Sequence, residues 1–149
     1  MMRRRLAAWR RQEGGASAVE FALVVGPLFF LLLGAIECGR LLWTRQILQS
    51  LAISTARCMG VRQAVCASSS TYSATMTTAY VIAQATKLGI TLTSANVTLD
   101  ADASCGGVSG FSSATISYTF VSVAPKLVTA LAGGVAISAS ACFPNQPTS

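Results

Sequence analysis

The sequence predicts an α+β protein in which a long N-terminal helix packs on a small antiparallel sheet with a second, short helix. Three observations favour this class. An uncharged, mostly apolar run covers residues 21–36 and predicts that the first half of the helix spans a membrane. An amphipathic pattern with helical spacing follows the run. Further along, short segments alternate apolar residues with serine and threonine, as strands with one buried face do.

Composition supports a single domain with part of its apolar content in lipid. The chain has 149 residues, of which 52% are hydrophobic and 11% charged, and this length is typical of one domain. The formal net charge of +6 is concentrated before the apolar run, where a basic cluster marks the cytoplasmic side of a membrane segment. The remainder shows no basic stripe with interleaved aromatic residues, so nucleic acid is not expected as a partner.

The side chains that usually carry catalysis are missing or badly placed, so we expect no enzyme, cofactor or small-molecule substrate. The chain has no histidine and no C-x-x-C pair, which removes the commonest general base and a frequent metal-ligand pattern. Asp100 and Asp102 are interpreted as solvated turn residues. Glycines 106, 107 and 110 lack the lysine and the following helix of a phosphate-binding loop.

Two carboxylates flank the apolar run. Residues 21–36 lie between Glu20 and Glu37, and sixteen helical residues rise about 24 Å, slightly less than a bilayer core. Adding residues 16–19 gives a span over 16–36 of the expected length but places Glu20 inside it. A carboxylate in that position costs roughly 2.5–3.5 kcal/mol on insertion scales, so Glu20 calls for a function.

Three interpretations of this N-terminal segment compete. A secretory signal peptide would need a small-x-small cleavage site after the run, but the run ends in Ile36, Glu37 and Cys38. A plain single-pass anchor would leave Glu20 at the level of the lipid headgroups. The third interpretation starts from the residues around Gly15.

A basic leader, a glycine, five residues ending in glutamate, then phenylalanine and an apolar run resembles the processing site of type IV prepilins and pseudopilins. The matching residues are Gly15, Ala16, Glu20 and Phe21. The resemblance implies that a prepilin peptidase removes leader residues 1–15 and that Ala16 becomes the new N-terminus. It also implies that Glu20 pairs with the α-amino group of a neighbouring subunit, because a buried charge is tolerated when it is paired.

More narrowly, residues 16–57 resemble the TadE-like proteins of the tight-adherence (Flp) pilus system. Four features carry the resemblance: the segment from Ala16 to Leu23, the proline at position 27, the segment from Ile36 to Arg40, and the alanine-rich helix that follows. It covers roughly the first third of the chain. It implies assembly roles for four residues, namely Glu20, Pro27, Glu37 and Arg40. Cys38 departs from the pattern, which has an aromatic residue after the second glutamate.

This resemblance implies a minor pseudopilin with a pilin-like fold and no catalytic activity. Its expected partners are the lipid bilayer, the prepilin peptidase, other pilins and pseudopilins, and pilus assembly proteins. Its expected location is the bacterial inner membrane, crossed once, with the N-terminus cytoplasmic and the C-terminal domain periplasmic or extracellular. The alternative is an anchored binding or adhesin domain that is neither processed nor polymerised.

The long helix is expected over residues 16–66, with its last turn near Val65. Pro27 lies inside it and predicts a kink or local unwinding, which is either an ordinary transmembrane proline or a flexible point for filament packing. Two faces are expected beyond the span. The apolar face contains Leu41, Leu48, Leu51, Ala52, Thr55 and Met59, and the polar face contains Arg40, Arg45, Gln46, Gln49, Arg57 and Arg62.

Residues 67–149 are expected to form the exported α+β head. A turn over 67–71 precedes a helix over 73–88, which Gly89 would cap. Strands are predicted over 90–99, with a break at 94–96, and over 114–123 and 135–143. A flexible loop is expected over 104–110, and a short helix or connection over 125–134.

Four of the five cysteines follow the span, an even number that suits two disulfides in an oxidising compartment. Cys58 and Cys66 would close a short loop, and Cys105 and Cys142 would join the strand region to the last strand. Four cysteines allow three pairings, and the sequence does not choose among them. Small buried thiols are the alternative. Cys38 is expected to be a free, apolar residue.

Overall fold

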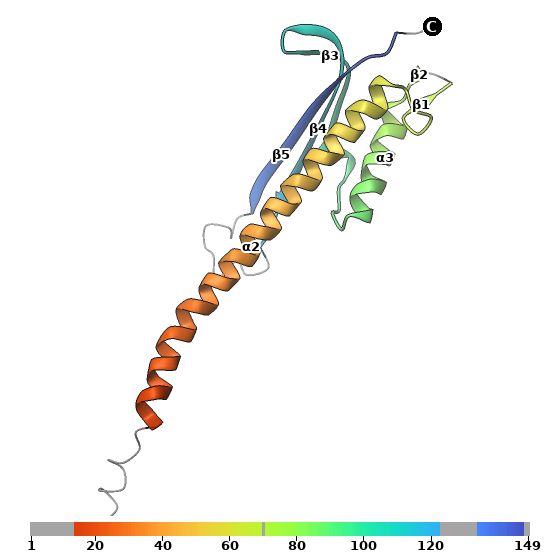
Figure 1. Ribbon diagram of the computed structural model, residues 1–149. Coiled ribbons are helices and arrows are strands. Elements are labelled where there is room, and N and C mark those ends of the chain that lie inside the picture. Colours follow the sequence, from red (N-terminus) through yellow and green to blue (C-terminus); the bar gives the residue numbers. More distant parts are fainter. Residues whose placement is uncertain (1–13, 70, 123–133, 148–149) are drawn as a thin grey trace, which may run out of the picture. The chain divides into compact units, whose positions relative to one another are not determined.

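The structure is a computed structural model that describes residues 14–69, 71–122 and 134–147. The chain divides into two compact units, Met1–Gly39 and Arg40–Ser149. Helix α2, Gly14–Gly60, runs through both (Figure 1). The fold is α+β and pilin-like, with the long apolar helix, second short helix and antiparallel sheets that the sequence predicts. Residues 1–13 and 123–133 lie outside the described residues, and with them most of the predicted leader over 1–15 and of the predicted short helix or connection over 125–134.

Helix α2 ends several residues before the predicted Val65. The amide of Gln63 donates to the carbonyl of Cys58 and that of Arg62 to Met59, the two bonds of a Schellman motif. Arg62 takes the left-handed position, with φ 52°. Because glycine usually occupies that position, the sequence carries no stop signal here. The helix also continues through Pro27, so of the two predicted outcomes the local unwinding is absent and the kink stays a prediction.

The head portion of α2 buries the predicted apolar face. Leu48, Ala52 and Thr55 are fully buried and Met59 is 2% exposed. Ile47, Ala56 and Cys58 are buried as well, which widens the buried stripe beyond the predicted positions. Arg45, Gln46 and Arg57 remain exposed on the other side. The helical period therefore predicts the face correctly and its width only in part.

Helix α3, Ala74–Lys87, lies within one residue of its predicted bounds at each end. The side chain of Ser73 accepts a hydrogen bond from the amide of Met76 at 3.4 Å, which is an N-cap contact. At the other end Gly89 has φ 77°, and the amides of Gly89 and Ile90 donate to Thr86 and Ala85. This Schellman motif confirms Gly89 as the capping residue.

Short elements replace two predicted irregular or extended segments. The expected turn over 67–71 lies in a two-stranded hairpin of β1, Ala67–Ser68, and β2, Thr71–Tyr72. Residues 90–93 are not a strand. They lead into the 3₁₀ helix η1, Ser94–Asn96, where Asn96 Oδ1 accepts bonds from the amide and the hydroxyl of Thr93 at 2.8 Å each. This local capping favours a turn over a continued strand.

The main sheet has the antiparallel order β3–β4–β5, formed by Val97–Cys105, Val108–Phe120 and Val135–Pro144. The predicted flexible loop over 104–110 is instead the tip of the β3–β4 hairpin. Cys105 pairs with Val108, and Gly106 and Gly107 have φ 61° and 83°, as a two-residue type I′ turn requires. The loop prediction was wrong because two adjacent glycines also suit this turn.

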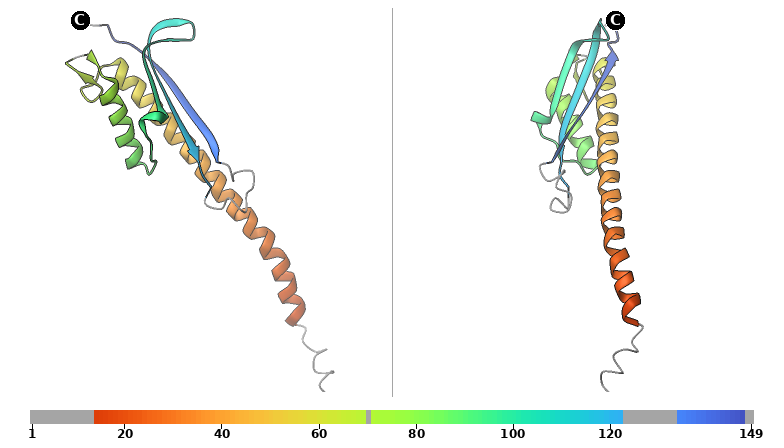
Figure 2. Two further views of the ribbon diagram at one scale, coloured as in Figure 1. Left: turned by 180° about the vertical axis from the view of Figure 1, so that it is seen from behind. Right: turned by 90° about the vertical axis from the view of Figure 1, so that its left-hand side faces the viewer.

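Both helices cover the same face of the sheet (Figures 1 and 2). The core combines α2, α3 and alternate residues of β4 and β5, among them Leu48, Val81, Ile116 and Ile137. A smaller cluster forms around Met59 and Ala114, with Tyr72 and Phe143 packed against it. On the uncovered face, β4 and β5 present small hydroxyl side chains such as Ser117 and Ser138, both exposed. The sheet is therefore a two-layer element with one apolar face.

Candidate functional site

The first part of α2 presents its apolar side chains outward. The described residues contain one helix long and apolar enough to cross a membrane, Ser17–Gly60, whose most apolar window has a mean hydropathy of 2.3 and none of its residues buried. Outward-facing apolar residues are normally few in a protein surrounded by water. Here ten large ones are more than half exposed: Val19, Phe21, Leu23, Val24, Leu28, Phe29, Phe30, Leu31, Leu32 and Ile36.

Glu20 lies among these apolar residues near the start of the helix. Its neighbours Val19 and Phe21 are 60% and 70% exposed, and Glu20 is itself exposed. A carboxylate surrounded by an apolar helix surface is poorly solvated once that surface is in lipid, so it needs a polar or charged partner there. The geometry thus leaves the carboxylate accessible to a cation from outside this helix.

The predicted processing site lies in the first turn of α2. Gly15 and Ala16 are helical, so the peptide bond between them is not extended. Among the described residues, no atom lies within 4 Å of a side-chain Cβ placed on Gly15. Extending this peptide bond would require the terminal helical turn to unwind.

The two predicted assembly residues at the end of the span have contrasting environments. Glu37 is 2% exposed, although the sequence places it at the boundary of the apolar run. Arg40, in the head unit, has its guanidinium carbon 5.4 Å from the centroid of the Phe120 ring, a cation–π distance. Arg40 therefore covers the end of β4 and has a packing contact in addition to any assembly role.

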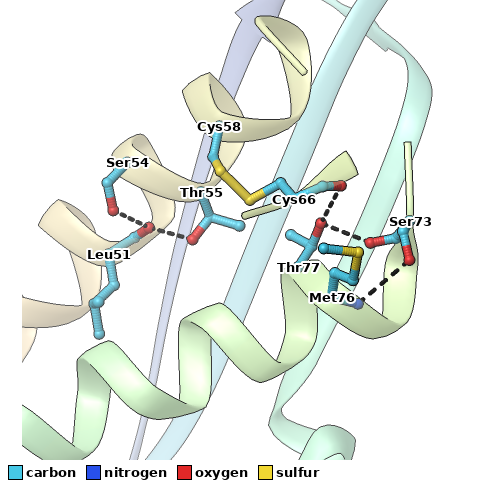
Figure 3. Close-up of a disulfide and its surroundings, with 8 residues drawn as sticks. All are labelled: Leu51, Ser54, Thr55, Cys58, Cys66, Ser73, Met76 and Thr77. Carbon is cyan, nitrogen blue, oxygen red and sulfur yellow. Dashed lines mark hydrogen bonds between the residues drawn. A yellow bond between two sulfur atoms is a disulfide. The ribbon is translucent and has the colours of Figure 1, made fainter. Parts of the chain in front are cut away.

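Two disulfides hold the head. Cys58 is bonded to Cys66, which ties the last turns of α2 to the following loop, and Thr77 of α3 donates to the Cys66 carbonyl at 3.3 Å (Figure 3). Cys105 is bonded to Cys142 across 37 residues. Of the three pairings open to the sequence, this is the one present, and the buried-thiol alternative is wrong. Cys38 is free and exposed.

The second disulfide requires the hairpin tip to fold over. Strands β3 and β5 both flank β4, so they lie about 9.5 Å apart in a flat sheet, but the Cα atoms of Cys105 and Cys142 are 6.5 Å apart. The β3–β4 register shifts twice between Asp100 and Cys105, and Gly110 has φ 85°. These irregularities bend the hairpin (Figure 1).

Asn145 secures the bent hairpin, and sequence reasoning missed it. Its side-chain amide donates to the Ala101 carbonyl at 2.8 Å and its Oδ1 accepts from the Ser112 hydroxyl at 2.6 Å. Its backbone amide donates to Gly110 at 2.9 Å. One side chain thus satisfies groups on β3 and β4 at once. Its position between Pro144 and Gln146 in a polar tail gives no local signal for such contacts.

The two aspartates of the head lie on strand β3, so the prediction of turn residues is wrong. The amide of Asp102 donates to Asp100 Oδ1 at 3.0 Å, and both residues are exposed on β3. Burial raises the pKa of Tyr72 above its ordinary value, and the negative charge of Asp100 raises it further. Within the ranges that the structure describes, no three histidine, cysteine or acidic side chains gather as a metal site.

Comparison with known families matches the same N-terminal part of the chain. Residues 15–57 match the family model of the TadE-like protein. This match supports the resemblance seen in the sequence and suggests involvement in a tight-adherence pilus. It starts at Gly15 and ends within the head portion of α2. Searches of curated proteins and of solved structures each find no match to this chain.

Proposed function

We propose that this chain is a minor pseudopilin of a tight-adherence pilus, anchored in the bacterial inner membrane and processed after Gly15. The observation that carries the proposal is the exposed apolar helix with one carboxylate near its start, in the segment that matches the TadE-like protein. The head carries two disulfides, which supports export to an oxidising compartment. The N-terminus is therefore cytoplasmic.

Processing and assembly are linked through Glu20 in this proposal. Cleavage by the prepilin peptidase frees the α-amino group of Ala16, which is positively charged at neutral pH. The Glu20 carboxylate of one subunit then pairs with that amino group of the next subunit. Because an unpaired charge in lipid is costly, correct pairing fixes the register between neighbouring helices. Glu20 acts in assembly and performs no catalysis.

The substitution Glu20→Ala tests this role. We expect the variant to insert and to be processed but to be absent from sheared pili and from cross-linked complexes with other pilins, since the pairing partner of the α-amino group is gone. Ser17→Ala, one helical turn earlier on the same exposed helix, is the matched control and should assemble normally. Assembly of Glu20→Ala at the level of this control would refute the registering role.

The competing function is an anchored binding domain that does not polymerise. That protein would keep its leader and start at Met1, whereas the processed subunit starts at Ala16. It would also tolerate Glu20→Ala without any change in its interactions. The two functions are therefore separated by the N-terminus of the protein and by its presence in pili.

A further inference from the structure

Exposed apolar side chains gather at one end of the head. The head portion of α2 starts with Leu42 and Trp43, which are 64% and 70% exposed. Leu88, just after α3, is 50% exposed, and Val121, just after β4, is 61% exposed. We call these four residues the basal patch. The four residues come from three separate parts of the head, namely α2, the end of α3 and the end of β4, so the patch does not depend on the sequence of one helix alone.

Contacts inside the head place these elements at the same end. Trp43 and Leu88 line one hollow of about 220 Å³ together with Gln46, Ile47 and Ser50. Arg40 lies over Phe120, the residue before Val121. Helix α3 thus runs antiparallel to α2, since its start contacts Cys66 through Thr77 and its end lies beside Trp43. Figure 2 shows the two helices side by side.

The described acidic residues of the head lie at one end only, whereas basic residues lie at both ends, with Arg57 and Arg62 at the end of α2 away from the basal patch. Arg45 and Lys87 are exposed beside the basal patch, and Arg45 lines a groove with Leu41, Leu42 and the start of β5. The described acidic residues of the head, Asp100 and Asp102, lie on β3 at the level of Ser113 and Cys142, near the opposite end of the sheet. The patch is therefore apolar with a basic rim.

We propose that the basal patch docks on the headgroup layer of the membrane and that its occupant is anionic phospholipid. Tryptophan is favoured at this depth because its ring is apolar and its N–H can bond to water or headgroups. The arginine and lysine of the rim would contact lipid phosphates. This inference rests on the proposed membrane span, and adds a second contact with the bilayer made by the head.

The spacing along the helix is compatible with this depth. Trp43 follows Ile36, the end of the apolar run, by seven residues, which is about 10 Å of helix rise. The interfacial layer is roughly 5–8 Å thick on each side of the hydrocarbon core. The Cα of Trp43 would therefore lie just beyond this layer on a continuous helix, a gap that a side chain as long as tryptophan can bridge.

Fluorescence quenching tests the docking in the full-length protein. The chain has two tryptophans, so Trp9→Phe leaves Trp43 as the single reporter. In bilayers containing phosphatidylglycerol, lipid brominated near the headgroup end of the acyl chain should quench Trp43 more than lipid brominated near the methyl end, and aqueous iodide should quench it weakly. Strong iodide quenching without lipid quenching would overturn the proposal. Shielding from both quenchers would also overturn it, because a second protein copy would then cover Trp43.

A second reporter separates this inference from the proposed span. In a Trp9→Phe, Trp43→Phe background, Phe29→Trp places the only tryptophan in the middle of the apolar run. Quenching of this reporter by the deeply brominated lipid, together with an unquenched Trp43, would leave the anchor intact and refute the docked head. Absence of lipid quenching at both positions would refute the membrane span itself.

Charge variants test the choice of lipid. Arg45→Gln and Lys87→Gln should each lower the ratio of docked to undocked heads about fivefold on anionic bilayers, measured as loss of shallow quenching of Trp43. Arg57→Gln is the matched control, since Arg57 is exposed in the last turn of the same helix, and should have no effect. Equal quenching in phosphatidylglycerol and phosphatidylcholine bilayers would contradict the anionic partner.

Discussion

Gly60 is needed for close packing and not for capping. A Cβ at this position would lie 2.7 Å from Phe143 Cδ1 and 2.9 Å from the Pro144 carbonyl oxygen. The Gly60 carbonyl also accepts a bond from the Gln146 amide at 2.9 Å. The end of α2 and the end of β5 therefore meet at the one residue of this turn that lacks a side chain.

The substitution Gly60→Ala should destabilise the head by about 1–3 kcal/mol, the usual cost of overpacking, because the Pro144 backbone must move. Urea unfolding of the head measures it. Gly39→Ala is the control in the same helix, since its Cβ would meet no atom of the described residues within 4 Å, and it should cause no loss of stability. Equal stability of the two variants would contradict this prediction, because it would show that the end of β5 can move away from a Cβ at Gly60 at no measurable cost.

Tyr72 provides a test by pH. Burial and, to a smaller degree, the charge of Asp100 raise its pKa above 10.0, so its phenol should ionise at higher pH than an ordinary tyrosine. The folded state favours the neutral phenol. Its contribution to stability is therefore present below pH 10 and is lost as pH rises through the raised pKa.

Absorbance titration of the wild type and of Tyr72→Phe isolates the signal of Tyr72. We expect a difference curve with its midpoint above 10.0, shifted back partly by Asp100→Asn. A midpoint at or below 10.0, the ordinary tyrosine pKa, would contradict the prediction. It would show that water reaches the Tyr72 ring and the small cluster around Met59.

At the scale of elements, local signals predict well and long-range ones poorly. Helix α3 could be placed within one residue at each end because its apolar residues have helical spacing and Gly89 is an ordinary C-terminal cap. The end of α2 could not, because Arg62 adopts a left-handed conformation that glycine or asparagine usually takes. The hairpin tip was predicted as a loop, since its adjacent glycines Gly106 and Gly107 suit a flexible loop as well as a tight turn, and the contacts of Asn145 with β3 and β4 are long-range.

The two disulfides should contribute unequally to stability. In the chain-entropy model, the bond from Cys105 to Cys142, with a separation of 37 residues, contributes about 4 kcal/mol, and the bond from Cys58 to Cys66, with a separation of 8, about 2.5 kcal/mol. Replacing each pair by serine and comparing urea unfolding measures the difference. A larger loss of unfolding free energy on removing the Cys58–Cys66 bond would contradict this ranking. It would indicate that holding the end of α2 in place matters more than loop entropy.

For the whole molecule, the sequence predicted the fold class and an apolar helix long enough to cross a membrane, whereas the position of Glu20 inside the membrane stays a prediction. Those features depend on local patterns, namely the uncharged run and the 3.6-residue period. The basal patch could not be predicted in this way. Trp43, Leu88 and Val121 are far apart in the sequence, and they gather only because α3 runs antiparallel to α2 and β4 ends under Arg40.

The central claim is that the chain is a processed pilus subunit, and the N-terminal residue tests it most directly. The protein should be isolated from native membranes, and its N-terminus and intact mass determined with and without the prepilin peptidase. The account predicts a start at Ala16 that is lost when the peptidase is deleted. A start at Met1 in both strains would contradict it and leave a plain anchored domain.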